Sequence, residues 1–352
     1  MFDVNQIVRK NIKNLTPYSS ARDEFSGHAK VFLDANENSL GSPLGNEYNR
    51  YPDPYQHVLK KAIGQQKNIG EANLFIGNGS DECIDLLFRC FCEPGKDNVI
   101  ICPPTYGMYE VSARINDIEV RKAILNEDFQ LDTITIMKQV NDYTRIIWIC
   151  SPNNPTGNSM KREDILFLLK SFNGLIVLDE AYIDFSSGVS FLGQLPEYPN
   201  LVVLQTFSKA WGLAALRLGM AFADETIINI LNKIKPPYNI SAATQQLVLQ
   251  ALAQNELVKD HISQLIILRE MLRENLSRIS FVETIHGSDA NFLLVQMKEP
   301  KLVYNFLIDN GIVVRNRHNI LLCEGCLRIT VGTTNENELL IKALTNYSNQ
   351  IS

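Results

Sequence analysis

A lysine with two hydroxyl groups and an arginine near it stands directly after an apolar run of the chain. The run is 201–204, and the residues after it read QTFSKAWGL. Lys209 in this segment offers an amine that can bond covalently to an aldehyde, and Thr206, Ser208 and Arg217 are groups suited to gripping a phosphate. Ligands of open α/β sheets bind at the carboxyl ends of the strands. The segment therefore predicts a covalent site beside an anion-binding site, both at the end of a strand.

A carboxylate and a phenol follow a second apolar run. After 175–178 the chain reads DEAY, which places Asp179 three residues before Tyr182. Asp179 could pair with the protonated nitrogen of a pyridine ring, and Tyr182 could hydrogen-bond an oxygen on that ring and influence its chemistry. A lysine amine, a phosphate-binding group and this carboxylate together suit pyridoxal 5′-phosphate, whose protonated ring accepts electrons from a substrate carbanion.

Two further turns carry polar groups that suit the same cofactor. The sequence SPNNPTG at 151–157 is a stiff turn that can hold the amide of Asn154 toward a ligand. The sequence GNGSDE at 77–82 opens a predicted helix, and glycines before a helix N-terminus let backbone N–H groups reach a phosphate. Asn154 is thus a candidate donor to the ring oxygen, and the helix start is a candidate phosphate site.

The elements that must position these residues alternate along the chain. Short apolar runs are typical of strands buried on both faces, and between them lie segments with helical periodicity. The alternation predicts an α/β fold with a mainly parallel sheet covered by helices. The predicted strands are 99–102, 145–150, 175–178 and 201–204, and the clearest predicted helices are 80–92 and 160–172.

The pattern changes near residue 241, where long helical segments run to 278 and short strands and helices follow. We therefore expect a large cofactor-binding domain over 45–245 and a smaller α+β domain over 28–44 and 246–352. Residues 1–27 show little periodicity and predict an N-terminal arm that lies against something else, for which the second subunit of a dimer is the natural candidate.

Composition and charge narrow the class of protein. Hydrophobic residues make up 45% and charged residues 20%, as in an ordinary globular protein. Lys and Arg number 33 against 39 Asp and Glu, and they are dispersed, so no nucleic-acid partner is expected. No signal-like segment and no run of about 18 apolar residues occurs, so we expect a cytoplasmic protein that does not enter a membrane.

Seven cysteines, mostly in apolar segments, predict reduced and buried thiols and no disulfide framework. Cys323 and Cys326 have CxxC spacing, but no second pair of ligands matches it, so no metal is expected. None of the five histidines lies inside the cofactor motifs, and no catalytic histidine is expected. They are His28, His57, His261, His286 and His318.

The motifs GNGSDE, SPNNPTG, DEAY and SK with Arg217, in this order and spacing, resemble those of the fold-type I pyridoxal-phosphate enzymes of the aspartate aminotransferase superfamily. The resemblance covers nearly the whole chain. It implies a three-layer large domain, a smaller domain and an N-terminal arm. Further segments are similar to those of histidinol-phosphate aminotransferases, namely 14–22, 33–38, 49–52, 102–109 and 326–333.

The resemblance implies a cofactor role for each matching residue. Lys209 is the Schiff-base lysine and moves the α-proton, Tyr106 stacks on the ring, and Asp179, Asn154 and Tyr182 hold the ring. Tyr51 comes from the second subunit, which implies a homodimer with shared active sites. The remaining phosphate contacts are Gly79, Ser80, Asp81, Thr206, Ser208 and Arg217.

For the substrates, the resemblance assigns Arg328 to the carboxylate of glutamate or 2-oxoglutarate, and Arg315 joins Arg328 around the phosphate of histidinol phosphate. Guanidinium groups suit a site that must accept either anion. Tyr18 and Asn36 line the same pocket. Arg317 could replace or assist Arg315, and the sequence does not separate the two.

The implied reaction is ping-pong amino transfer in histidine biosynthesis, between histidinol phosphate or imidazole acetol phosphate and 2-oxoglutarate or glutamate. A threonine-phosphate decarboxylase and a broad aromatic amino acid aminotransferase are the alternatives. A transcription regulator with an aminotransferase-like domain is disfavoured, because no basic cluster precedes the large domain.

Overall fold

The computed structural model describes residues 2–20, 24 and 30–351. Its larger sheet has the order β1-β7-β6-β5-β4-β2-β3, and β7 runs antiparallel to its two neighbours while the other pairs are parallel. The expectation of a mainly parallel sheet is therefore confirmed. The strands are β1 Leu74–Asn78, β2 Asn98–Ile101, β3 Glu119–Lys122, β4 Thr144–Cys150, β5 Leu175–Asp179, β6 Leu201–Thr206 and β7 Leu218–Ala223.

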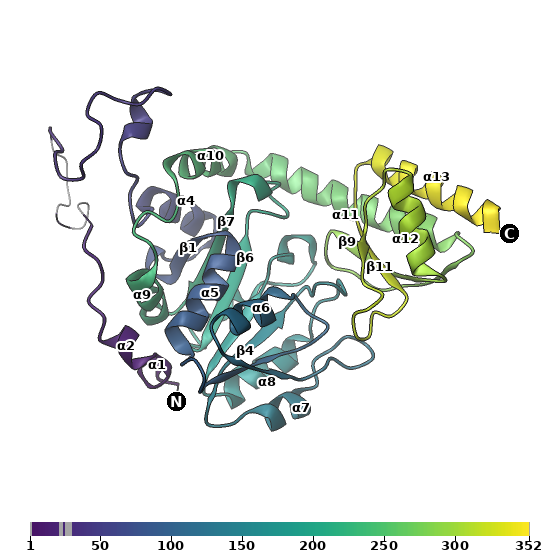
Figure 1. Ribbon diagram of the computed structural model, residues 1–352, viewed down its shortest axis with the longest axis horizontal. Coiled ribbons are helices and arrows are strands. Elements are labelled where there is room, and N and C mark those ends of the chain that lie inside the picture. Colours follow the sequence, from purple (N-terminus) through teal and green to yellow (C-terminus); the bar gives the residue numbers. More distant parts are fainter. Residues whose placement is uncertain (1, 21–23, 25–29, 352) are drawn as a thin grey trace.

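Helices cover both faces of this sheet and make three layers (Figure 1). The apolar sides of α5, α6 and α9 pack on one face, and those of α4, α7, α8 and α10 pack on the other. Because both faces are covered, β5, β6 and β7 are buried along their whole length. The helices are α4 His57–Lys67, α5 Gly79–Phe91, α6 Met108–Ile115, α7 Thr133–Gln139, α8 Arg162–Ser171, α9 Glu225–Ile234 and α10 Ala242–Leu252.

A smaller antiparallel sheet of order β10-β11-β9-β8 lies at the other end of the molecule (Figure 1). Three helices pack with it around a separate apolar core. Its elements are α11 Asn255–Ser277, β8 Val282–Ile285, β9 Phe292–Met297, α12 Pro300–Asp309, β10 Arg315–Asn316, β11 Cys326–Thr330 and α13 Thr334–Ile351. Short 3₁₀ helices complete the chain, at η1 Asn46–Asn49, η2 Glu71–Asn73, η3 Ile183–Phe185, η4 Phe191–Gln194 and η5 Ala214–Leu216.

The predicted strands and helices are present with ends shifted by one or two residues. The long helical region splits at Ala253 and Gln254 into α10 and α11, while β1, β3 and β7 were not predicted. The proposed domain limits stay a prediction, and the one between 27 and 28 falls outside the described residues.

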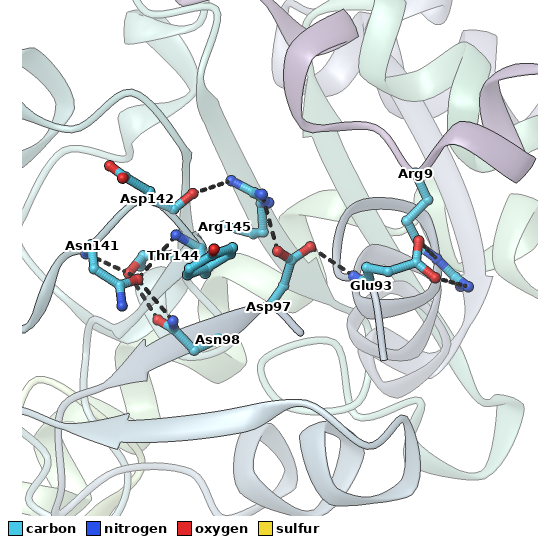
Figure 2. A network of polar contacts seen from close by, with 9 residues as sticks. Arg9, Glu93, Asp97, Asn98, Asn141, Asp142, Thr144 and Arg145 are labelled. Carbon is cyan, nitrogen blue, oxygen red and sulfur yellow. Dashed lines mark hydrogen bonds and ion pairs between the residues drawn. The ribbon is translucent and has the colours of Figure 1, made fainter. Parts of the chain in front are cut away.

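The N-terminal segment is tied to the larger sheet at the edge where β2 and β4 begin (Figure 2). The segment starts with α1 Val4–Ile7 and α2 Lys10–Lys13, and Arg9 between them lies 3.2 Å from a carboxylate oxygen of Glu93. The backbone N–H of Glu93 donates to Asp97, which also pairs with Arg145 at 3.0 Å. Polar groups at this edge thus have partners within the protein.

Candidate active site

A cavity of about 670 Å³ opens at the carboxyl ends of β4, β5 and β6 and reaches the hairpin formed by β10 and β11. Its size is that of a typical small-molecule site. The cavity brings together most of the predicted site residues, namely Ser80, Asp81, Tyr106, Asn154, Asp179, Tyr182, Thr206, Ser208, Lys209, Arg217, Arg315 and Arg328.

Lys209 lies just past the end of β6, in a loop whose start is fixed by hydrogen bonds between Thr206 and the backbone. Thr206 donates its hydroxyl to the carbonyl of Leu218 at 3.2 Å and accepts the N–H of Ser208 at 3.1 Å. The amine of Lys209 lies 5.6 Å from the ring centroid of Tyr182. Desolvation by the cavity walls and the nearby Arg328 lower the pKa of Lys209, which favours the neutral, nucleophilic amine.

Asp179 ends β5 and is a buried carboxylate with partners on both oxygens. The hydroxyl of Tyr109 donates to one oxygen at 2.7 Å, and the N–H of Ala181 donates to the other at 3.0 Å. Burial raises the pKa of Asp179 to about 6, and these hydrogen bonds oppose the rise. The group is therefore mostly a carboxylate at neutral pH, ready to accept a hydrogen bond or pair with a cation.

Tyr109 is a site residue that sequence reasoning missed. It is fully buried on α6, and its ring stacks on Trp148 with the centroids 5.0 Å apart. Its position three residues after Tyr106, in the first turn of α6, is the available signal. Tyr106 itself donates to Asp81 at 3.1 Å and meets Tyr109 edge to face.

Asn154 links the two sheets. Its amide nitrogen lies 3.5 Å from the hydroxyl of Tyr182, and its carbonyl oxygen accepts a hydrogen bond from Arg328 at 2.5 Å. The guanidinium of Arg328 also lies over the ring of Phe292, 5.1 Å from the centroid. A substitution of Arg328 would therefore remove a hydrogen bond to Asn154, one of the residues predicted to hold the cofactor ring.

The start of α5 forms a cradle whose shape depends on two glycines. A Cβ on Gly79 would lie 2.6 Å from a guanidinium nitrogen of Arg217, and a Cβ on Gly219 would lie 2.1 Å from the backbone nitrogen of Ser80. Arg217 also donates to Ser208 at 3.4 Å. The free space, the helix N-terminus and the guanidinium fit a phosphate group.

Four predicted residues do not line this cavity, and one of them is Gly79, the first residue of α5. Tyr18 and Asn36 are exposed. Tyr51 is 50% exposed, and its ring stacks on that of Tyr238 with the centroids 4.4 Å apart. Their roles stay predictions, and for Tyr51 the predicted site is that of the second subunit.

The described histidines do not line the cavity, whereas one cysteine does. Of the histidines that the structure describes, none lines the cavity, while His28 lies outside the described residues. All seven cysteines are buried and free, and Cys150 borders the cavity. Within residues 2–20, 24 and 30–351, no group of three or more His, Cys, Asp or Glu side chains could hold a metal ion.

Sequence comparisons agree with this geometry. Residues 25–344 match the model of aminotransferase class I and II. The histidinol-phosphate aminotransferase of Cytophaga hutchinsonii is 52% identical over 347 residues, which are 98% of this chain and 99% of the relative. The one from Parabacteroides distasonis is 51% identical over 98% of this chain and 99% of the relative. The chain belongs to the histidinol-phosphate aminotransferase family.

Solved structures of other proteins have the same fold as this chain. The histidinol-phosphate aminotransferase of Sinorhizobium meliloti, solved in complex with pyridoxal 5′-phosphate, has a TM-score of 0.80 and 22% identity over 90% of each chain. In the part of the chain that the structure describes, no helix combines the length and apolar character needed to cross a membrane.

Proposed function

We propose that this protein is a pyridoxal-phosphate-dependent aminotransferase that exchanges an amino group between histidinol phosphate and 2-oxoglutarate. The main support is a single cavity. One side of it carries the amine of Lys209, the buried carboxylate of Asp179 and the phosphate cradle, and the other side carries arginines. The family membership gives the substrates, because its members at about half identity are histidinol-phosphate aminotransferases. The place of such a reaction is histidine biosynthesis.

The chain's own residues divide the work of holding the cofactor. When bound, pyridoxal phosphate supplies an electron sink for the bond broken at the substrate α-carbon. Asp179 would accept the hydrogen bond of the ring nitrogen, Asn154 and Tyr182 would donate to the ring oxygen, and Tyr106 would pack on the ring. Arg217 and the start of α5 would bind the phosphate, together with Ser208 and Thr206.

Lys209 has two tasks in this proposal. Its amine would hold the cofactor covalently in place of the aldehyde oxygen, which leaves as water. Once released from that bond by the amine of the substrate, the neutral amine would serve as the base that moves the proton of the substrate α-carbon. Its lowered pKa suits both tasks, because only the neutral amine can attack or accept a proton.

We further propose a homodimer with shared sites. The chain between residues 31 and 44 exposes four large apolar side chains, Val31, Leu33, Leu40 and Leu44, at 68–98% of their area. This segment extends away from both sheets (Figure 1). A partner subunit would cover these side chains, and Tyr51 would then reach the partner's phosphate cradle, with Tyr18 and Asn36 bordering a substrate pocket.

A cytoplasmic location fits the thiols. All seven cysteines are free, and such a set persists in a reducing compartment.

The test is a mixture of the purified holoenzyme, histidinol phosphate and 2-oxoglutarate, in which glutamate and carbon dioxide are followed together. Glutamate without carbon dioxide supports the proposal. Carbon dioxide release with threonine phosphate and no glutamate would replace it with a decarboxylase, and preference for phenylalanine or tyrosine would replace it with an aromatic aminotransferase.

A further inference from the structure

Three arginines share one face of the hairpin that closes the cavity. Arg315 in β10 stands directly opposite Arg328 in β11, and the N–H of Arg317 donates to the carbonyl of Cys326 at 3.0 Å. Side chains two apart on a strand, or directly opposite in an antiparallel pair, point to the same face. Arg315, Arg317 and Arg328 therefore project together, and all three line the cavity.

The three guanidinium groups have no negative partner among the residues that the structure describes. Arg317 makes a long bond of 3.4 Å to the carbonyl of Asn316, and the Nε atoms of Arg317 and Arg328 are buried with no hydrogen-bond partner. Burial and the neighbouring Arg315 lower the pKa of Arg317. Like charges directly opposite on a sheet destabilise it, and buried donors without partners add to the cost. An anion between them would remove both penalties.

The charge and donor count of this face fit a dianion better than a carboxylate. One guanidinium binds a carboxylate through two parallel hydrogen bonds, so Arg328, which the family resemblance assigns to the carboxylate, already suffices for that group. A third guanidinium gains a role with a phosphate, which has two negative charges and three free oxygens. The cofactor phosphate is served elsewhere, by Arg217 at the start of α5.

We propose that Arg317 is a specificity-determining residue that binds the phosphate dianion of the substrate together with Arg315 and Arg328. Its N–H groups donate to the phosphate oxygens, so the enzyme prefers a phosphorylated substrate over the same alcohol without phosphate. This inference rests on the proposed function and extends it, since it assigns the third arginine and states what that residue discriminates.

The experiment compares Arg317→Gln, Arg317→Lys and the natural enzyme as holoenzymes, with histidinol phosphate and with unphosphorylated histidinol, 2-oxoglutarate being the acceptor. We expect Arg317→Gln to lower kcat/KM for histidinol phosphate by about 10-fold to 100-fold, mainly through KM, because a charge-assisted hydrogen bond is lost. The value for histidinol should stay within about twofold. Arg317→Lys keeps the charge but not the fork of donors, so its loss should be intermediate.

A second readout uses inorganic phosphate as the probe. Inorganic phosphate should inhibit the natural holoenzyme competitively, because the cofactor already fills the other phosphate cradle, and Arg317→Gln should weaken this inhibition by a similar factor. Arg278→Gln, which removes the exposed arginine that directly follows α11 and pairs with Glu274, is the matched control and should change neither value.

The outcomes separate two failures. If the natural enzyme forms no glutamate from histidinol phosphate, the proposed function is wrong. If it does so, and Arg317→Gln leaves kcat/KM unchanged or lowers it equally for histidinol phosphate and histidinol, the role of Arg317 is wrong. Should Arg317→Gln fail to retain cofactor, the same comparison made on Arg317→Lys decides, since an equal loss on both substrates overturns the role and a selective loss supports it.

Discussion

The two walls of the cavity differ in how completely their polar groups are paired. On the wall formed by the larger sheet, Asp179 has donors on both oxygens, and Asp81 is bonded to Tyr106. On the wall formed by the hairpin, Arg317 and Arg328 keep buried nitrogens without partners. A paired wall suits a resident cofactor that must always meet the same geometry. An unpaired, cationic wall suits anions that enter and leave, because the partners arrive with the substrate.

Lys209→Ala should show the largest effect, since it removes the amine that bonds to the cofactor and moves the proton of the substrate. We expect turnover to fall by about 10⁴-fold or more, because both the covalent bond and the proton transfer are lost. The cofactor should still bind noncovalently through the paired wall. Single-turnover glutamate formation and cofactor absorbance measure the two effects. Lys259→Ala, at an exposed surface lysine, should match the natural enzyme, and full activity in Lys209→Ala would contradict the assignment.

Gly219→Ala tests whether the cradle on the paired wall depends on close backbone contact. The added Cβ would lie 2.1 Å from the nitrogen of Ser80, so β7 or the start of α5 must shift. We expect a loss of about 1–3 kcal/mol of unfolding free energy and at least about tenfold weaker cofactor binding. Denaturant unfolding and cofactor titration check these values. The control is Gly193→Ala, whose Cβ would meet nothing within 4 Å. Normal cofactor affinity in Gly219→Ala would show that this close backbone contact does not shape the phosphate site.

Tyr109→Phe probes the pairing of Asp179 through pH. Since the pKa of Asp179 is raised to about 6, its carboxylate is ionised above that pH and protonates below it, so cofactor affinity should fall as pH drops through about 6. Loss of the Tyr109 hydrogen bond raises this pKa further, so the fall should begin at higher pH. We also expect roughly tenfold weaker binding at neutral pH. Cofactor titration from pH 5 to 8 measures both.

The control is Tyr143→Phe, at an exposed tyrosine remote from the cavity, which should keep the pH profile of the natural enzyme. An unshifted profile in Tyr109→Phe would show that Tyr109 does not set the ionisation of Asp179.

Arg9→Ala gives the smallest effect and concerns the polar network where β2 and β4 begin (Figure 2). The cavity lies at the other end of β4. Its partly exposed pair with Glu93 should contribute only about 0–1 kcal/mol to stability. Turnover and cofactor affinity should not change, because the network touches the strands where they begin. Thermal unfolding and steady-state kinetics measure the two. A large loss of turnover would show that this edge is coupled to the cavity.

Sequence patterns predicted the paired wall better than the unpaired one. Lys209, Asp179 and Asn154 each follow an apolar run that can only be a buried strand, so their common edge could be inferred. Tyr109 was missed because its role depends on how α6 packs against β5. Arg317 was left open because its direction depends on the register of β10 against β11, which a strand of two residues does not reveal. Tyr18, Asn36 and Tyr51 are exposed in this chain, and their predicted roles depend on the proposed second subunit.

The most direct test of the division between the walls is the cofactor dissociation constant of the double variant Arg315→Gln with Arg317→Gln, measured beside its KM for histidinol phosphate. Neither arginine bonds to a residue of the paired wall in the described structure. We therefore predict cofactor affinity within about twofold of the natural enzyme and a KM raised by about 100-fold or more. A cofactor affinity that falls as far as the substrate affinity would show that the two walls act as one site, and would contradict the account.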